Sequence, residues 1–130
     1  MIKMISKSFF RNLSVTGWLI IINAVASILS IILWSIYPNF IDYVALKPIS
    51  IIHGKYLWTL VTHMFVHGGF FHLFINMFVL FSLGGLCERI IGRKRFLWFY
   101  LSAGLFAGLL SVFFAGFFGF GSFEKVFGRN

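Results

Sequence analysis

Acidic residues are scarce in this 130-residue chain, which has three Asp and Glu against eleven Lys and Arg. Charged residues make up only 11% of the sequence, whereas they form about a quarter of a soluble domain. So few charges could not cover the surface of a water-soluble globule, and this excludes a soluble enzyme. The single cysteine, Cys87, excludes an internal disulfide and any metal motif built from several cysteines.

The chain is rich in apolar side chains instead. Hydrophobic residues account for 60% of the sequence and aromatic residues for 21%, which excludes intrinsic disorder. The basic residues fall between long apolar runs rather than along one polar helix face, so they indicate membrane topology and not a nucleic-acid site. The predicted environment is therefore a lipid bilayer.

Three apolar segments are long enough to cross a bilayer, at residues 17–37, 70–87 and 96–118. The first has 21 residues without a formal charge, and at ~1.5 Å per residue it matches a hydrocarbon core of ~30 Å. The predicted fold class is an all-α membrane protein with three transmembrane helices. The connecting segment 38–58 is too apolar for a solvated linker, so we expect a membrane-associated outer loop, with a plain connection as the alternative.

Basic residues also predict the orientation of the chain. The first 11 residues carry three Lys and Arg and the 88–95 loop carries four, whereas the outer loop and the tail after residue 118 carry two each. Short cytoplasmic loops collect Lys and Arg. We therefore expect a multi-pass integral protein, of the cell membrane, with its N-terminus in the cytoplasm.

Polar residues inside the second span are the strongest sign of function. His72 and Asn76 are four residues apart and share one helix face. Polar groups within a membrane usually mark functional sites, although hydrogen bonds to neighbouring helices are an alternative. A metal site at His63, His67 and His72 would lack a nearby carboxylate and fits no established spacing, so we predict no metal and no cofactor.

Glu88 and the small residues of the third span each indicate a contact with another segment. Glu88 is unfavourable at the C-terminal end of a helix, which indicates a fixed partner for its carboxylate. The third span carries small residues in two adjacent columns, which allow close packing of helix backbones. The partner of these columns is left open between this chain, a second copy and another protein. The columns consist of Ala103, Ala107, Ser111 and Ala115, and of Gly104 and Gly108.

The order of motifs from Leu46 to Gly108 resembles the rhomboid family of intramembrane serine proteases. The most specific element is the pattern of a histidine, four residues, a histidine, three residues and an asparagine, at His67, His72 and Asn76. Other elements support it in the same order along the chain: Trp58-Thr59, His67-Gly68-Gly69, Gly84 to Glu88, Gly92, and Phe96 to Tyr100.

The resemblance implies a mechanism and roles for several residues. In the family, a serine in a Gly-x-Ser-Gly motif attacks a peptide carbonyl, and a histidine on a later span is its base. The counterparts of His72 and Asn76 help to form the oxyanion hole, which suits two side-chain donors on one helix face. His67 resembles a structural residue that holds the outer loop, and Glu88 resembles a structural anchor. Implied partners are transmembrane-protein substrates.

The chain departs from the family pattern in its serine and its number of spans. No Gly-x-Ser-Gly occurs, and all four histidines precede the third span. Ser122 is the nearest imitation, but phenylalanines surround it and no helix follows, so we do not expect it to be a nucleophile. Ser102 and Ser111 are expected to be helix-packing hydroxyls. We therefore expect residues 1–130 to form one truncated rhomboid-like domain, the first half of a six-helix bundle.

The sequence leaves open whether this chain is an enzyme. Without the nucleophile and its base, it is expected to be inactive alone, as a gene fragment or as one part of a split enzyme that needs its C-terminal half. The runner-up is a non-catalytic rhomboid-like protein that binds the transmembrane helices of partners. A third class, a small oligomeric metal or ion carrier, would require the histidines to be ligands.

Overall fold

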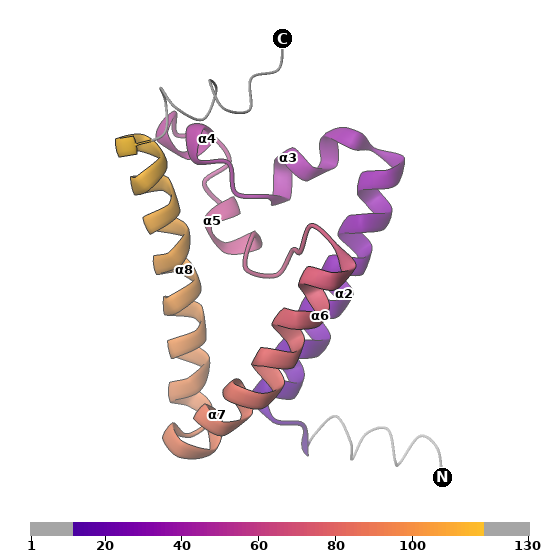
Figure 1. The fold of residues 1–130 in the computed structure, drawn as a ribbon, viewed down its shortest axis with the longest axis vertical. Helices are drawn as coiled ribbons and strands as arrows, with labels where there is room; N and C mark the ends of the chain where they lie inside the picture. The colour runs from indigo at the N-terminus through magenta and orange to yellow at the C-terminus, as the bar shows by residue number, and fades with distance from the viewer. Residues whose placement is uncertain (1–11, 119–130) are drawn as a thin grey trace.

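Three long helices dominate the computed structural model, which describes residues 12–118. Helix α2 spans Val15–Ile36, a second continuous helix spans Phe70–Ile91, and α8 spans Arg93–Phe118. Their mean hydropathy lies between 1.9 and 2.4, and each is long enough to cross a membrane. In Figure 1, α2 and the second helix lie side by side, and α8 diverges from them to form a V whose vertex is α7. The described residues contain no strand.

Helix α2 buries a polar face. Ser14 caps its N-terminus, accepting a hydrogen bond of 3.0 Å from the backbone N–H of Gly17. The helix ends before Pro38, which begins the short helix η1 (Pro38–Phe40). Along one side, spaced three to four residues apart, lie the buried residues of α2: Thr16, Leu19, Asn23, Ser27 and Ser30. Because four of these five are polar, α2 contacts its neighbours through hydrogen bonds as well as packing.

The second long helix contains a wider turn in its middle. It consists of α6 (Phe70–Val79), a π-helical turn η2 (Leu80–Gly84) and α7 (Gly85–Ile91). The turn ends at Gly84, where a Cβ would lie 3.2 Å from the ring of Phe96 on α8. Phe96 is almost fully buried against this glycine. The close approach joins the two arms of the V near its vertex.

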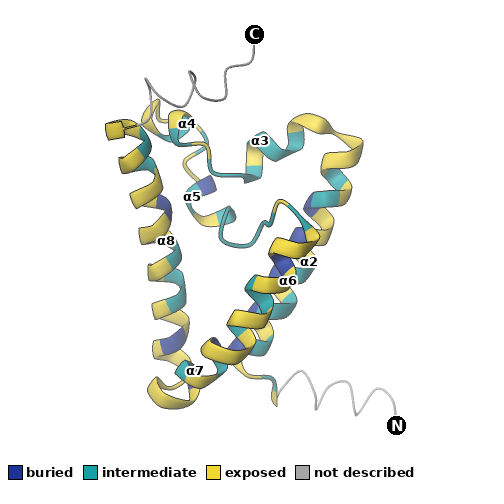
Figure 2. Ribbon diagram, in the orientation of Figure 1, coloured by how far each residue is buried: buried dark blue, intermediate teal, exposed yellow. Residues whose placement is uncertain are grey.

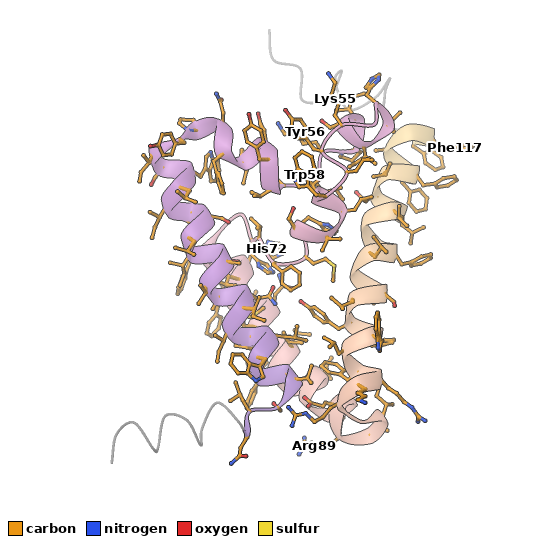
Figure 3. The ribbon with its side chains drawn as sticks, turned by 180° about the vertical axis from the view of Figure 1, so that it is seen from behind. Lys55, Tyr56, Trp58, His72, Arg89 and Phe117 are labelled. Carbon is orange, nitrogen blue, oxygen red and sulfur yellow. The ribbon has the colours of Figure 1, made fainter. Side chains whose placement is uncertain are left out.

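The segment between the first two spans crosses the open end of the V. It contains α3 (Ile41–Val44), α4 (Pro48–Ile52) and α5 (Thr59–Thr62) in addition to η1. α4 packs against the end of α8, where a Cβ on Gly116 would lie 3.3 Å from Ile52. The ring of Tyr56 contacts the rings of Tyr43 and Trp58 edge to face. These aromatic residues lie at the open end of the V, as Figure 3 shows for Tyr56 and Trp58.

The three predicted spans are present, and all three extend beyond the predicted limits at their charged ends. The prediction ended the second span at Cys87 and began the third at Phe96, which left residues 88–95 as a loop. The structure leaves only Gly92 between the helices, with φ of 87°, a conformation that favours glycine. Charged residues do not end a helix by themselves, because its backbone hydrogen bonds do not depend on apolar side chains.

The glycine column of the third span has its partner within this chain. A Cβ on Gly104 would lie 2.1 Å from Met64, and one on Gly108 would lie 2.7 Å from the ring of His63. The segment around α5 therefore packs directly on the backbone of α8 at these positions. Much of the remaining α8 surface is exposed and apolar (Figure 2), as expected for a helix that faces lipid or further helices.

Candidate functional site

A cavity of about 400 Å³ lies between the two arms of the V. Asn76 of α6, Asn23 of α2 and Tyr100 of α8 contribute polar groups to its wall, together with His63 and His67. The remaining lining is apolar, so this is a low-dielectric space with a few polar groups at its border. Cavities of ~300–1,000 Å³ with this character are typical ligand and active sites.

Asn76 lines this cavity and has an uncommitted donor. One N–H of its Nδ2 group donates to the backbone oxygen of His72 at 3.0 Å, within the same helix. This bond fixes the orientation of the side-chain amide. An amide nitrogen carries two hydrogens, and the second has no hydrogen-bond partner among residues 12–118. One hydrogen of the amide is therefore bound and fixes its orientation, and the other is free to donate to an anion.

His72 lies one helical turn before Asn76, and its side chain is exposed. Its ring contacts the ring of His67 edge to face, with centroids 5.2 Å apart. Figure 3 labels His72 about midway along the molecule, between the α2–α6 pair and α8. His72 and Asn76 thus share a face of α6, but only Asn76 is among the residues that line the cavity.

Ser27 of α2 holds the connection that precedes α6. Its hydroxyl lies 2.9 Å from Nδ1 of His67 and 3.1 Å from the backbone oxygen of Phe65, and it accepts a bond of 3.2 Å from the backbone N–H of His67. Ser27 is fully buried. A serine beside a histidine suggests a nucleophile and base, but a buried hydroxyl bound to the backbone is inaccessible to a substrate. The contacts agree with the structural role that the resemblance implies for His67.

Burial lowers the pKa of His67 from its ordinary value of 6.5, and the neighbouring His72 lowers it further. A lowered pKa keeps the imidazole neutral at neutral pH. Because the Ser27 hydroxyl donates to the backbone oxygen of Phe65, Nδ1 of a neutral His67 in the Nδ1–H tautomer can donate to that hydroxyl. The connection before α6 therefore carries no uncompensated charge into the apolar interior.

Asn23 lines the same cavity and has a buried, unsatisfied acceptor. Its Nδ2 donates to the backbone oxygen of Leu19 at 2.7 Å and to the hydroxyl of Tyr100 at 3.1 Å. Its Oδ1 is buried and has no partner within the described chain. A buried oxygen without a donor costs about 1–3 kcal/mol. Asn23 thus lines the cavity, but its Oδ1 is buried and not open to a ligand there.

The histidines do not assemble into a metal site within the described chain, where no three potential ligands cluster. Nδ1 of His63 faces the backbone oxygen of Thr59 at 2.8 Å. His63 has no predicted role outside the metal hypothesis, whereas in the structure its ring packs on Gly108. Ser102 and Ser111 are exposed on α8. Ser122 lies outside the described residues.

Glu88 has the fixed partner that its position in the helix indicated. One carboxylate oxygen accepts from the backbone N–H of Val15 at 2.8 Å. The other accepts from the backbone N–H of Thr16 at 2.8 Å and from its hydroxyl at 2.7 Å. These donors lie in the first turn of α2, where helices carry free N–H groups and favour negative charge. Glu88 thereby joins α2 to α7 at the vertex of the V.

The buried polar face of α2 was missed in the sequence, although its signal was present. Thr16, Asn23, Ser27 and Ser30 recur at spacings of seven, four and three residues, which places them on one helix face. Each of the first three binds a different part of the molecule: Glu88, Tyr100 and the connection at residues 65–67. The face positions the segments that carry Asn76 and His72.

Comparisons with known proteins identify the family of this chain. Residues 54–128 match the Rhomboid domain. The chain is 35% identical over 82 residues to Rhomboid protease GluP of Bacillus subtilis (strain 168), and 30% identical over 80 residues to Putative rhomboid protease YdcA of the same organism. It is 28% identical over 106 residues to Rhomboid-like protease 1 of Toxoplasma gondii.

These alignments cover 63%, 62% and 82% of this chain, but only 16%, 37% and 36% of the relatives. The chain therefore spans well under half the length of each. No solved structure gives a significant match. The match to the Rhomboid domain covers more than half of the 130 residues and includes the motifs around His72 and Asn76. This chain therefore belongs to the rhomboid family.

Proposed function

We propose that this chain supplies the oxyanion-stabilising part of a rhomboid intramembrane serine protease. The observation that carries the proposal is the Asn76 amide, which is oriented by His72 and has a free N–H at the border of a low-dielectric cavity. Family membership supports a protease reaction. The substrates would be transmembrane proteins whose peptide carbonyl reaches this cavity.

In the proposed reaction, a serine oxygen attacks the peptide carbonyl carbon and passes its proton to a histidine base. The carbonyl oxygen becomes an anion, and Asn76, with His72 beside it, donates hydrogen bonds to it. The intermediate then collapses, the C–N bond breaks and the base returns its proton to the leaving amine. Neither a Gly-x-Ser-Gly motif nor a histidine after α8 occurs in these 130 residues. We therefore propose that a further rhomboid segment supplies both groups.

The first test uses an active-site probe. We expect the purified 130-residue chain not to react with fluorophosphonate probes and not to cleave transmembrane substrates, because the serine–histidine contact found among residues 12–118 is buried. Labelling is measured by in-gel fluorescence, with Ser27→Ala and Ser122→Ala as controls. Labelling that either substitution abolishes would show that the chain carries its own nucleophile.

A second test separates the protease from a non-catalytic protein that binds partner helices. A rhomboid segment with a Gly-x-Ser-Gly motif and a late histidine is supplied, fused or co-expressed. Recovery of probe labelling and of substrate cleavage supports the protease. Stable assembly of the two segments without any labelling favours the binding protein.

The proposed orientation places the N-terminus and the α7–α8 junction in the cytoplasm. Lys55 and Arg89 lie at opposite ends of the molecule in Figure 3, and Lys94 follows the junction at Gly92. In a Cys87→Ser background, we expect Lys55→Cys to react with a membrane-impermeant maleimide on intact cells. Lys94→Cys should react only after the cells are opened. The reverse pattern would exclude this topology.

A further inference from the structure

A second cavity lies at the vertex of the V, between the beginning of α2 and the end of the second helix. Its volume is about 650 Å³. It is separate from the cavity at Asn76, and the proposed protease reaction does not use it. Its lining has two chemical halves. Leu13, Ile20 and Phe81 are apolar, whereas Ser14, Arg89 and Arg93 are polar or basic.

The place of this cavity coincides with the end of the apolar spans. α2 begins at Val15, and α7 and α8 meet at Gly92. In a membrane, such positions lie where the hydrocarbon core gives way to the headgroups. Ile20 and Phe81 therefore lie at the depth of acyl chains, whereas Arg89 and Arg93 lie at the depth of lipid phosphates.

Arg89 has free donors for an anion. Its Nε donates to the backbone oxygen of Gly85 at 3.3 Å, and this is its only hydrogen bond within the described chain. The guanidinium group has five N–H donors arranged in a fork that matches phosphate oxygens. Arg93 already uses one of its donors in a short bond, because its Nη2 donates to the backbone oxygen of Leu13 at 2.8 Å. Arg89 is therefore the principal anion-binding group.

One carboxylate, Glu88, also lines this cavity, but its charge is already compensated. It accepts three hydrogen bonds from Val15 and Thr16, and it lies 3.9 Å from Nε of Arg93. The other acid among residues 12–118, Asp42, pairs with Lys47 on the outer segment. Since Lys94 and Arg95 follow Arg93 directly, the vertex has a net positive charge.

We propose that this cavity binds an anionic phospholipid. Its phosphate would receive hydrogen bonds from Arg89, and its glycerol and first methylene groups would lie against Ile20 and Phe81. The unbalanced positive charge favours a lipid with net negative charge over a zwitterionic one, whose ammonium group would meet like charges. The apolar half of the lining favours a lipid over free phosphate.

The test measures lipid binding to the purified chain in mild detergent, by native mass spectrometry during titration. Phosphatidylglycerol is compared with phosphatidylcholine, and inorganic phosphate is added as a competitor. We expect phosphatidylglycerol to bind about tenfold more tightly than phosphatidylcholine. Arg89→Gln should remove this preference, a tenfold loss being usual for a charge-assisted hydrogen bond.

Arg95→Gln is the matched control, because it removes the same charge at the same end of the molecule but does not line the cavity. We expect it to change binding less than twofold. Arg89→Lys keeps the charge without the fork and should give an intermediate loss, which tests the site even if Arg89→Gln folds poorly. Equal losses for Arg89→Gln and Arg95→Gln, equal binding of both lipids, or displacement by equimolar phosphate would each overturn the proposal. None of these results depends on proteolysis.

Discussion

Replacement of Glu88 by alanine is expected to lower the free energy of unfolding by about 3–4 kcal/mol, because it leaves several buried donors without an acceptor at about 1–3 kcal/mol each. The carboxylate is only 7% exposed and accepts three short hydrogen bonds from the first turn of α2. Without it, the backbone N–H groups of Val15 and Thr16 lose their acceptors. The hydrogen bonds that join α2 to α7 at the vertex of the V would then be lost, and the two helix ends would separate.

Glu88→Gln should cost less, about 1.5–3 kcal/mol. Glutamine keeps one acceptor oxygen but turns an NH₂ group toward a donor of α2. Asp42→Asn is the control, since it makes the same acid-to-amide change in an exposed ion pair and should cost less than about 1 kcal/mol. Stability is measured by SDS-induced or thermal unfolding in mild detergent. Equal stability of Glu88→Gln and the wild type would mean that Glu88 does not anchor α2.

The spans and the position of Glu88 show what the sequence could predict, and the partner of Glu88 shows what it could not. Three apolar runs of sufficient length predicted three spans, because the bilayer imposes a minimum length on any crossing helix. An acid at the wrong end of a helix dipole predicted that Glu88 has a partner. The partner itself could not be predicted, since Val15 and Thr16 lie more than 70 residues away along the chain.

The candidate site was predictable to the same degree. The spacing of His72 and Asn76 placed both on one face of α6, and the resemblance suggested their role. Neither observation could show that Asn76 borders the cavity while His72 contacts His67. Those relations depend on how Ser27 holds residues 65–67 and on where α8 diverges, and both are set by contacts between distant segments.

The interpretation of small residues in the third span shows the same limit. The columns predicted close backbone contact but not its partner. A long helix was the natural expectation for Gly104 and Gly108, yet two side chains beside a four-residue helix, His63 and Met64, occupy these positions. The small residues thus predicted where another segment approaches the backbone of α8, but the identity of that segment depends on the fold.

In a protein completed with a nucleophile and base segment, Asn76→Ala is expected to lower kcat by about 10²–10³, the usual loss for one oxyanion donor. The rate falls because the amide donates to the anion of the intermediate more strongly than to the uncharged substrate, so KM should change little. Membrane insertion should persist. Asn39→Ala, in the outer helix η1, is the control and should leave kcat unchanged.

The histidines then distinguish an oxyanion site from a metal site. His72→Ala should also lower kcat, by an amount that includes the lost contact with His67. His63→Ala should lower stability through its packing on Gly108 and should spare kcat in the molecules that remain folded. Activity is measured as cleavage of a transmembrane substrate at saturating concentration. If His63, His67 and His72 substitutions instead cost equal activity, and added Zn²⁺ restored the wild-type rate in proportion to occupancy, a metal would carry the reaction and the Asn76 assignment would be wrong.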